Sequence, residues 1–285
     1  VTNLILEIYK DLGFENVILK YSDRMATPSK VPQFPEGLCI DVDKLRNRGW
    51  STNLKKISKD KIKLDGYLDE NEWNLVLPAN NFIQRDPMEG EPSTEKTEVY
   101  ILYDEENLYI GAMLYDSNPE GILAYQKRRD QSLRTDDRFM WILDTFSDGR
   151  TGYFFEVNPA GLMGDGLIIG SGSYWGINKD WNGIWDARVV VVSNGWSIEV
   201  AIPFRTLNFD PNLDTWGINF QRTIRRKNEE ILWSGHKRNQ GIYRPQDAGR
   251  LTGLNNISQG LGLELVGYGK AEALKVQNES EGDYN

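Results

Sequence analysis

The residues best suited to chemistry lie in a long loop, rich in aromatic and polar side chains, that we expect over residues 171–186. Trp175 and Trp181 stand there among glycines, with Asn178 and Asp180 between them. The face of an indole ring stacks on the C–H surface of a sugar, while amide and carboxylate groups bond sugar hydroxyls. The loop therefore predicts a carbohydrate-binding surface with these four side chains as ligand contacts.

The tryptophans of this loop also have a structural interpretation, in which they fill the core beneath a long connection. We expect that role for Trp185. For Trp175 and Trp181 the sequence leaves both roles open. Exposed tryptophans would favour a binding surface, and packed ones would favour a structural role.

A second candidate site is the acidic cluster at residues 134–138. Asp136 and Asp137 are adjacent there, and with Asp165 or Asp186 they could hold Ca²⁺ through hard oxygen ligands. We therefore predict calcium as a cofactor, with Asp136 or Asp137 as a metal ligand. The alternative interpretation is a surface network of arginines and aspartates.

An enzyme that hydrolyses glycans would need two carboxylates on opposite sides of a cleft. Four acidic residues are available for such a pair: Asp136, Asp137, Glu156 and Glu199. The sequence does not place any two of them at a working separation, so hydrolysis stays an alternative to a non-catalytic role. The single histidine, His236, excludes zinc sites with several histidines, and the single cysteine, Cys39, excludes an internal disulfide.

Composition limits the classes of partner. The 285 residues carry a net charge of -9, and binding to phosphates needs a basic surface, so nucleic acid is not expected as a partner. No apolar run approaches the length of about 20 residues that a transmembrane helix needs. Residues 1–10 lack a basic region followed by a long apolar one, so no signal peptide is visible, although a mature secreted protein would look the same.

The elements that position these residues begin with the stretch from Lys63 to Tyr115. Asp65-Gly66 predicts a tight turn, because glycine accepts the positive φ that such turns need. A capped helical turn is expected after Asp69. Residues 98–103 and 108–115 are rich in Val, Ile, Leu and Tyr and flank four polar residues, which predicts a β-hairpin.

Further short strands follow this hairpin. They are predicted at residues 121–127, 138–144, 151–157, 187–192, 196–202, 216–223, 229–233 and 261–276. Asn194-Gly195 favours a tight hairpin turn between two of them. Many short strands separated by turns predict an all-β fold, an antiparallel, jelly-roll-like β-sandwich with few short helical turns, one of them at residues 204–207. The basic runs at residues 127–129 and 222–227 are expected to be solvated ends of strands.

The predicted domains are an N-terminal extension or linker (residues 1–60), the β-sandwich (residues 61–260) and the start of a following region or a tail (residues 261–285). The extension contains a predicted amphipathic helix at residues 4–14, followed by a linker punctuated by prolines. Residues 7–24 resemble part of the catalytic-domain region of threonyl-tRNA synthetases. The motifs with which those enzymes bind ATP and form an adenylate are not found elsewhere in the sequence, so no function is carried over.

Short motifs of glycine, aromatic and acidic residues follow a familiar order along residues 61–260. They are Leu64-Asp65-Gly66 with Asp69-Glu70 and Trp73; Leu108-Tyr109-Ile110-Gly111; Asp136-Asp137 with Leu143-Asp144; Gly152-Tyr153 with Val157-Asn158-Pro159 and Gly161; Trp185-Asp186-Ala187; Gly195-Trp196 with Glu199 and Ile202-Pro203-Phe204; and Trp216-Gly217-Ile218-Asn219-Phe220. This order resembles the family 9 carbohydrate-binding module-like domain. It is most similar to the form at the N-terminus of DUF5916 proteins of Bacteroidetes and related bacteria, where a predicted outer-membrane β-barrel follows the module.

The resemblance implies an antiparallel β-sandwich, often with bound calcium, and sugar held between two tryptophans in the members that bind it. This sequence departs from that clamp. The first clamp position falls near Arg134 and the second near Tyr243 or Ile242, while an acidic contact falls near Met140 and an arginine contact near Glu156. The resemblance therefore implies the fold without the tryptophan clamp, and Arg134 and Tyr243 join the four loop residues as predicted ligand contacts.

From these observations we predict a non-catalytic carbohydrate-binding-type module of a larger envelope protein that captures glycans or oligosaccharides. The resemblance implies an extracytoplasmic location: periplasm, outer membrane or secreted. One alternative is a structural or interaction domain without a sugar ligand, which covers the mouth of an outer-membrane barrel or docks a partner. The other is a glycan hydrolase.

Overall fold

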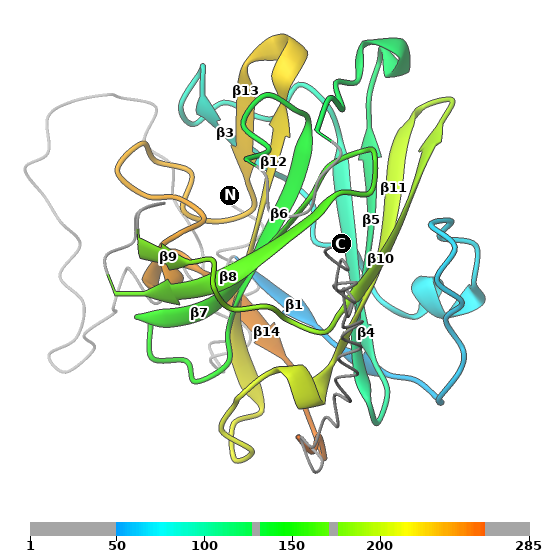
Figure 1. The fold of residues 1–285 in the computed structure, drawn as a ribbon, viewed down its shortest axis with the longest axis vertical. Helices are drawn as coiled ribbons and strands as arrows, with labels where there is room; N and C mark the ends of the chain where they lie inside the picture. Colours follow the sequence, from blue (N-terminus) through cyan, green and yellow to red (C-terminus); the bar gives the residue numbers. More distant parts are fainter. Residues whose placement is uncertain (1–49, 127–131, 171–175, 260–285) are drawn as a thin grey trace, which may run out of the picture. The chain divides into compact units, whose positions relative to one another are not determined.

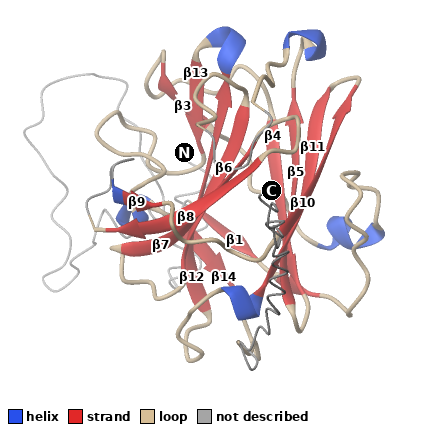
Figure 2. Ribbon diagram, in the orientation of Figure 1, coloured by secondary structure: helices blue, strands red, loops and turns tan. Residues whose placement is uncertain are grey.

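The computed structural model describes residues 50–126, 132–170 and 176–259. Within these ranges the regular structure consists of β-strands and short 3-10 turns, without an α-helix (Figure 2). The all-β prediction is therefore confirmed. No helix in these ranges is long and apolar enough to cross a membrane. The helix predicted at residues 4–14 and the strand predicted at residues 261–276 lie outside the described residues.

Among the described residues, the larger of two sheets has nine strands (Figure 1). They are β1 (Ser51–Asn53), β3 (Ile83–Asp86), β6 (Arg138–Asp144), β7 (Thr151–Val157), β8 (Met163–Ile169), β9 (Ile177–Asn178), β12 (Thr215–Ile224), β13 (Glu229–Leu232) and β14 (Gly249–Thr252). The main order is β1-β14-β12-β6-β7-β8-β9, and β13 pairs with both β12 and β3.

The smaller sheet has five strands, which lie beside the larger sheet in Figure 1. They are β2 (Lys55–Lys56), β4 (Thr97–Tyr103), β5 (Asn107–Tyr115), β10 (Asp186–Val192) and β11 (Gly195–Pro203). Their order is β10-β11-β5-β4-β2. The pairings of the two sheets are antiparallel except for β1 with β14 and β2 with β4, which are parallel. The predicted antiparallel sandwich is confirmed.

Aromatic and aliphatic side chains from the inner faces of both sheets fill the space between them. On β6, Phe139, Trp141 and Leu143 belong to this main core. Met140 and Ile142 belong to a separate cluster on the opposite, outer face. This division follows from the alternation of side chains along a strand. The nine-stranded sheet therefore has a buried outer face as well as a buried inner one.

Most predicted strands are confirmed within one or two residues, including the hairpin at Asn194-Gly195 that joins β10 to β11. The predicted helical turns are confirmed as η1 (Asn71–Leu75) and η4 (Phe204–Thr206). The strand predicted at residues 121–127 is wrong for the described residues, which form η2 (Pro119–Gly121) and then irregular backbone. Carboxylates bond the backbone N–H groups there, so no neighbouring strand does.

Strand β8 was not predicted, because glycines weaken the strand pattern. Glycine is required at positions 164 and 166, because neighbouring atoms leave no room for a side chain. A Cβ added to Gly164 would lie 3.0 Å from Cγ of Glu156, and one added to Gly166 would lie 2.6 Å from Cγ2 of Ile177. The two glycines therefore make room for a carboxylate on β7 and for the crossing of β9.

The sandwich also includes residues that the sequence assigned to the extension. β1 and β2 precede residue 61, and each is held by parallel pairing, β1 to β14 and β2 to β4. Both are only two or three residues long. Strands this short carry little periodic signal, so pairing partners distant in the sequence decide their structure.

The expectation that residues 222–227 form a solvated strand end is wrong for Arg222. Its side chain is 2% exposed and lies 3.7 Å from the carboxylate of Asp116. It also donates to the carbonyl of Lys96 at 3.1 Å. Burial lowers the pKa of Arg222 to about 10, against the nearby carboxylates that raise it. The register of β12 turns this side chain inward, and the basic run could not show that.

Candidate functional site

The outer face of the nine-stranded sheet carries polar side chains that strand pairing sets side by side. Gln221 on β12 is paired with Met140 on β6, and Met140 is paired with Glu156 on β7. The next row contains Arg138, Thr223 and Glu230. Side chains two residues apart on a strand share a face, so both rows point outward. We call Arg138, Glu156, Gln221 and Glu230 the outer-face band.

Glu156 is the buried carboxylate at the centre of this band. One carboxylate oxygen lies 3.5 Å from Nη1 of Arg138, and the other accepts a hydrogen bond of 2.9 Å from Nζ of Lys179. Arg138 also donates to the hydroxyl of Thr223 at 3.3 Å. A buried charge is tolerated when it is paired in this way. The geometry thus concentrates donors and acceptors in one place, and Lys179 reaches it from the loop predicted to bind sugar.

Gln221 brings an acceptor without a partner to the same face. Its side chain is 2% exposed. Its Nε2 donates to Glu230 at 3.3 Å, and Glu230 is also paired with Arg85. Its Oε1 has no hydrogen-bond partner among the described residues. A buried polar atom left unpaired costs about 1–3 kcal/mol. No described contact offsets that cost.

Tyr243 lies at the border of the band. Its ring centroid is 5.5 Å from that of Phe154 on β7. Phe154 and Glu156 are two residues apart on one strand, about 7 Å along it. The neighbouring Ile242 is buried against the outer face with Met140. The structure therefore brings together three of the four positions at which the family resemblance placed ligand contacts: Met140, Glu156 and the 242–243 pair.

The predicted contacts in the loop before β10 have separate surroundings. Trp185 is buried in the core, where its Nε1 donates to Asp165 at 2.7 Å, so the core interpretation is confirmed. Trp181 is half-buried, and its ring centroid lies 4.9 Å from that of Tyr153. A Cβ added to Gly183 would lie 2.7 Å from the indole. The ring of Trp181 is thus packed against its own protein on one side and partly exposed on the other.

Asn178 and Asp180, the two predicted polar contacts of this loop, are exposed. Asn178 belongs to β9, and its Oδ1 accepts a hydrogen bond of 2.9 Å from the backbone N–H of Asp180. This bond shapes the turn that follows β9. Trp175, the other predicted contact, lies outside the described residues.

The carboxylates of the acidic cluster before β6 accept hydrogen bonds from backbone N–H groups of the same protein. Asp136 is buried, and its Oδ2 accepts hydrogen bonds of 2.9 Å from the backbone of Gln126 and from Nδ2 of Asn158. Asp137 is buried too and accepts 2.8 Å from the backbone of Leu123. Burial raises the pKa of Asp137 against these bonds. Arg134 is exposed on the same loop, and its carbonyl accepts from the side chain of Arg225.

Calcium binding needs six to eight converging oxygen atoms. At Asp136 and Asp137 the carboxylates accept hydrogen bonds from N–H donors, which leaves fewer of their oxygen atoms for a cation, and nothing in these contacts tests calcium binding. The described ranges contain no group of three or more His, Cys, Asp or Glu side chains placed to hold a metal ion. Calcium at these aspartates therefore stays a prediction.

A hydrolytic pair of Glu156 and Glu199 is excluded by the fold. Glu199 lies on β11 on the outer face of the smaller sheet, since its neighbours Ile198 and Val200 belong to the main core. Glu156 lies on the outer face of the larger sheet. The two sheets stand between the carboxylates, so they cannot act on one glycosidic bond.

No protein-family model matches the chain. Solved structures share its fold. A family 9 carbohydrate-binding module (CBM9) from Caldicellulosiruptor kristjanssonii in complex with cellotriose is similar with a TM-score of 0.51 and 16% identity, covering 74% of this chain and 98% of that one. A family 9 module from the same organism in complex with glucose gives 0.51 and 16%, covering 71% and 96%.

A third similar structure is a candidate carbohydrate-binding protein from Bacteroides uniformis ATCC 8492. Its TM-score is 0.54 at 13% identity, and the match covers 71% of this chain and 98% of that one. Almost the full length of each neighbour is therefore matched. The likeness shows a CBM9-like fold, as the order of sequence motifs implied.

A short segment matches an unrelated enzyme. Over 24 residues, which are 8% of this chain, the sequence is 92% identical to the threonine–tRNA ligase of Pelagibacter ubique (strain HTCC1062). The match spans 4% of that enzyme. A segment of this size carries no activity of the enzyme to this chain.

Proposed function

We propose that the domain is a non-catalytic carbohydrate-binding module and that the outer-face band is its ligand site. The observation that carries the proposal is the row Gln221–Met140–Glu156, which holds an unpaired acceptor and a paired carboxylate on one sheet face. Support also comes from the shared fold, since two of the similar modules were solved with cellotriose and glucose.

The chemistry of the band matches that of a sugar. A hexose presents hydroxyls that both donate and accept, so its site needs partners of both kinds. Arg138 and Lys179 can donate, whereas Gln221 and Glu156 can accept. Gln221 and Glu156 are two strand spacings apart, about 10 Å at the backbone. Met140 between them is buried with Ile242, so a sugar ring would approach the band from its partly exposed border at Tyr243.

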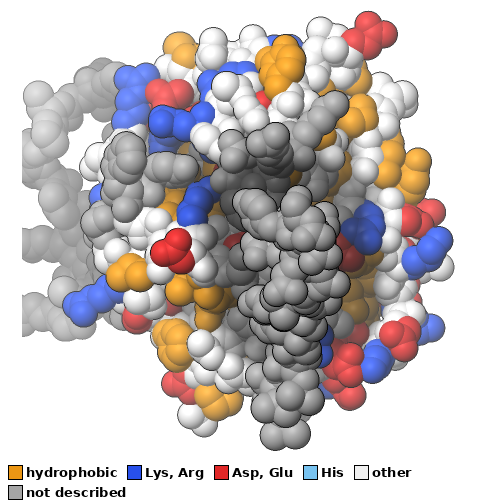
Figure 3. All heavy atoms as spheres, in the orientation of Figure 1, with side chains coloured by type: hydrophobic (Ala, Val, Ile, Leu, Met, Phe, Trp, Pro, Cys, Tyr) orange, Lys and Arg blue, Asp and Glu red, His pale blue; other side chains and the backbone are white. Residues whose placement is uncertain are grey.

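The face in Figure 3 carries basic and acidic side chains interspersed among the described residues. The described part of this face is therefore of mixed charge. A neutral oligosaccharide fits such a surface, because its binding depends on hydrogen bonds and ring contacts rather than on net charge. Tyr243, with its ring against Phe154, would supply an aromatic contact at the border of the band.

Isothermal titration of the full chain with cellotriose and with glucose tests the proposal. Gln221→Leu removes the acceptor and should weaken binding about tenfold, the value of one hydrogen bond. Its stability should be unchanged or higher, because the unpaired buried oxygen is removed with it. Tyr243→Ala should also weaken binding.

The matched control is Gln84→Leu, in the same sheet but outside the band. Gln84 is buried and its Nε2 donates to the carbonyl of Pro92 at 2.8 Å. Its removal should lower stability and leave sugar affinity unchanged. If both glutamine variants bind as the parent does, the ligand site lies elsewhere on the domain. If the parent binds no glycan in a broad array, the sugar-binding function itself is contradicted.

We also propose that the module works within a larger extracytoplasmic envelope protein that captures glycans. The support is the order of motifs along residues 61–260, which resembles modules followed by an outer-membrane barrel. Cell fractionation of the source organism with an antibody against this domain tests the location. Recovery in the cytosolic fraction would contradict it.

A further inference from the structure

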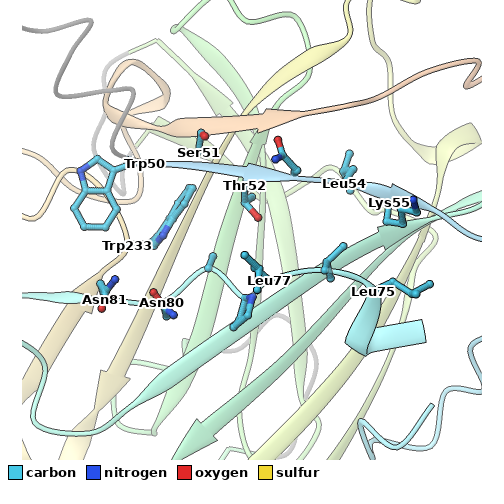
Figure 4. Close-up of a pocket in the computed structure, with 14 residues that line it drawn as sticks. Trp50, Ser51, Thr52, Leu54, Lys55, Leu75, Leu77, Asn80, Asn81 and Trp233 are labelled. Carbon is cyan, nitrogen blue, oxygen red and sulfur yellow. The ribbon is translucent and has the colours of Figure 1, made fainter. Parts of the chain in front are cut away.

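A cavity of about 680 Å³ opens at the side of the sandwich, between β1 and residues 75–81 (Figure 4). Trp50 and Trp233 close one end, with ring centroids 5.9 Å apart and ring planes nearly perpendicular. Leu54 and Ala79, which also line it, belong to the main core. The cavity therefore leads from the surface to the core between the edges of the two sheets.

One wall is the free edge of β1. The carbonyl of Trp50 accepts from Arg250, and the N–H of Leu54 donates to Thr252, both on β14. Backbone groups alternate in direction along a strand. Those of Ser51 and Asn53 consequently point away from β14 and toward the cavity. Neither residue has a backbone hydrogen-bond partner on that side among the described residues.

The opposite wall is an extended segment that borders the smaller sheet. Ala79 exchanges backbone hydrogen bonds with Val99 on β4, at 2.8 and 3.0 Å. By the same alternation, the backbone of Asn80 and the carbonyl of Pro78 face the cavity. Figure 4 shows this segment running alongside β1. Two strand edges with unused hydrogen-bonding groups therefore face each other across the slot.

The slot has the size of one strand. A strand of five residues is about 17 Å long and occupies about 4.8 by 10 Å in a sandwich, which is roughly 800 Å³. The cavity of about 680 Å³ comes close to that volume. An inserted strand could bond to both walls at once.

The rim of the slot specifies the chemistry of the occupant. Leu77 is 88% exposed and Leu75 is 55% exposed, so the rim presents aliphatic surface. Lys55 lines the far end, and no described acidic residue pairs with it. Its neighbours in the lysine run are paired, Lys56 with Glu105 and Lys59 with Glu106. An occupant should carry apolar side chains on one face and an acidic residue beside Lys55.

We propose that this slot binds an extended peptide segment of a partner protein by β-strand addition. Main-chain hydrogen bonds to Ser51, Asn53 and Asn80 hold the segment, and alternate apolar side chains fill the space against Leu54 and Ala79. Exposed sheet edges are templates for such pairing. The site is separate from the outer-face band and does not depend on sugar binding.

A labelled synthetic peptide in which valine and threonine alternate after an N-terminal glutamate is the probe. Fluorescence anisotropy measures its affinity for the full chain, and hydrogen exchange follows the amides of Ser51, Asn53 and Asn80, which the peptide should protect. Ser51→Pro removes the N–H that faces the slot and should weaken binding about tenfold. Ser51→Ala keeps that N–H and should bind as the parent does.

A charge exchange supplies a second test that does not depend on proline. Lys55→Glu should weaken binding of the glutamate peptide, and a peptide with lysine in place of glutamate should restore it. The proposal is overturned if the parent does not bind the peptide, or if Ser51→Pro and Ser51→Ala bind it equally. Protection of the same amides by cellotriose would make the slot a saccharide site instead. Protection that appears without peptide and disappears on dilution would make it a contact between copies of this chain.

Discussion

The carboxylate of Glu199 on β11 accepts a hydrogen bond of 2.9 Å from the backbone N–H of Gly66. Gly66 has φ of +94° in the turn predicted from Asp65-Gly66. The hydroxyl of Ser197 donates to the carbonyl of Gly66 at 2.6 Å, and Nε1 of Trp73 donates to Glu199 at 3.3 Å. The turn at Asp65-Gly66, near the start of the stretch from Lys63 to Tyr115, is thus bound to a buried carboxylate on the smaller sheet.

The raised pKa of Glu199 predicts that the free energy of unfolding falls as pH rises. Burial, together with nearby Glu70, raises the pKa of Glu199 to about 7 against the N–H donors. The folded state therefore holds a proton that the unfolded state releases near its ordinary pKa of 4.5. Stability should decline between about pH 4.5 and pH 7, by about 1–3 kcal/mol, and then level off.

Urea unfolding of the parent and of Glu199→Gln across this range measures the effect. The glutamine cannot ionise, so the variant should lack the decline. A parent curve that is flat or rises between about pH 4.5 and pH 7 would show that the carboxylate is ionised throughout.

The lowered pKa of Glu95 predicts that, at lower pH, the free energy of unfolding rises as pH rises. Burial raises its pKa, but hydrogen bonds of 2.6 Å from Lys227 and from Ser117 outweigh burial and lower the pKa to about 2. Its contribution is present above about pH 4.5 and is lost as pH falls toward 2. Glu95→Gln should lose about 1–3 kcal/mol at neutral pH and little at about pH 2. Chemical unfolding at the two pH values separates these cases, and equal losses at both would contradict the prediction.

The strands were predictable where alternation and β-forming residues agree. Residues 138–144 show this in Phe139, Trp141 and Leu143, all buried on one face. β8 could not be found in this way, because Gly164 and Gly166 serve neighbours that are distant in sequence. The local sequence pattern reflects the tendency of one segment to form a strand. Close packing between strands depends on residues from the whole sheet.

The candidate site was predictable only in part. The family resemblance pointed to positions near Met140, Glu156 and Tyr243, and the sheet register brings these together. Gln221 and Arg138 were not predicted, since their role depends on which strand lies next to which. A polar residue at an outward position inside an apolar strand is the signal that could have found Gln221. The core role of Trp185 was predicted, but the role of Trp181 stayed open, because the composition of a loop does not distinguish a tryptophan that fills the core from one that contacts a ligand.

Calcium removal tests the remaining prediction for the acidic cluster. If Asp136 or Asp137 holds Ca²⁺, millimolar calcium should raise the melting temperature above that of a sample in EDTA, by mass action on the folded state. A site of the affinity usual in extracellular modules would add about 1–3 kcal/mol. The comparison is repeated in Asp136→Asn, where the difference should vanish. Identical melting of the parent with and without calcium would contradict the prediction.

Two tryptophans of one loop should behave differently when removed. Trp185→Ala should destabilise the fold by about 3–5 kcal/mol, because it empties a core position and removes the bond to Asp165. Trp181→Ala should cost less, about 1–3 kcal/mol, since the ring is only half-buried against Tyr153. Urea melts of both variants measure the losses, and titration with cellotriose measures affinity. If Trp181→Ala abolishes sugar binding at unchanged stability, the loop and not the outer-face band is the ligand surface.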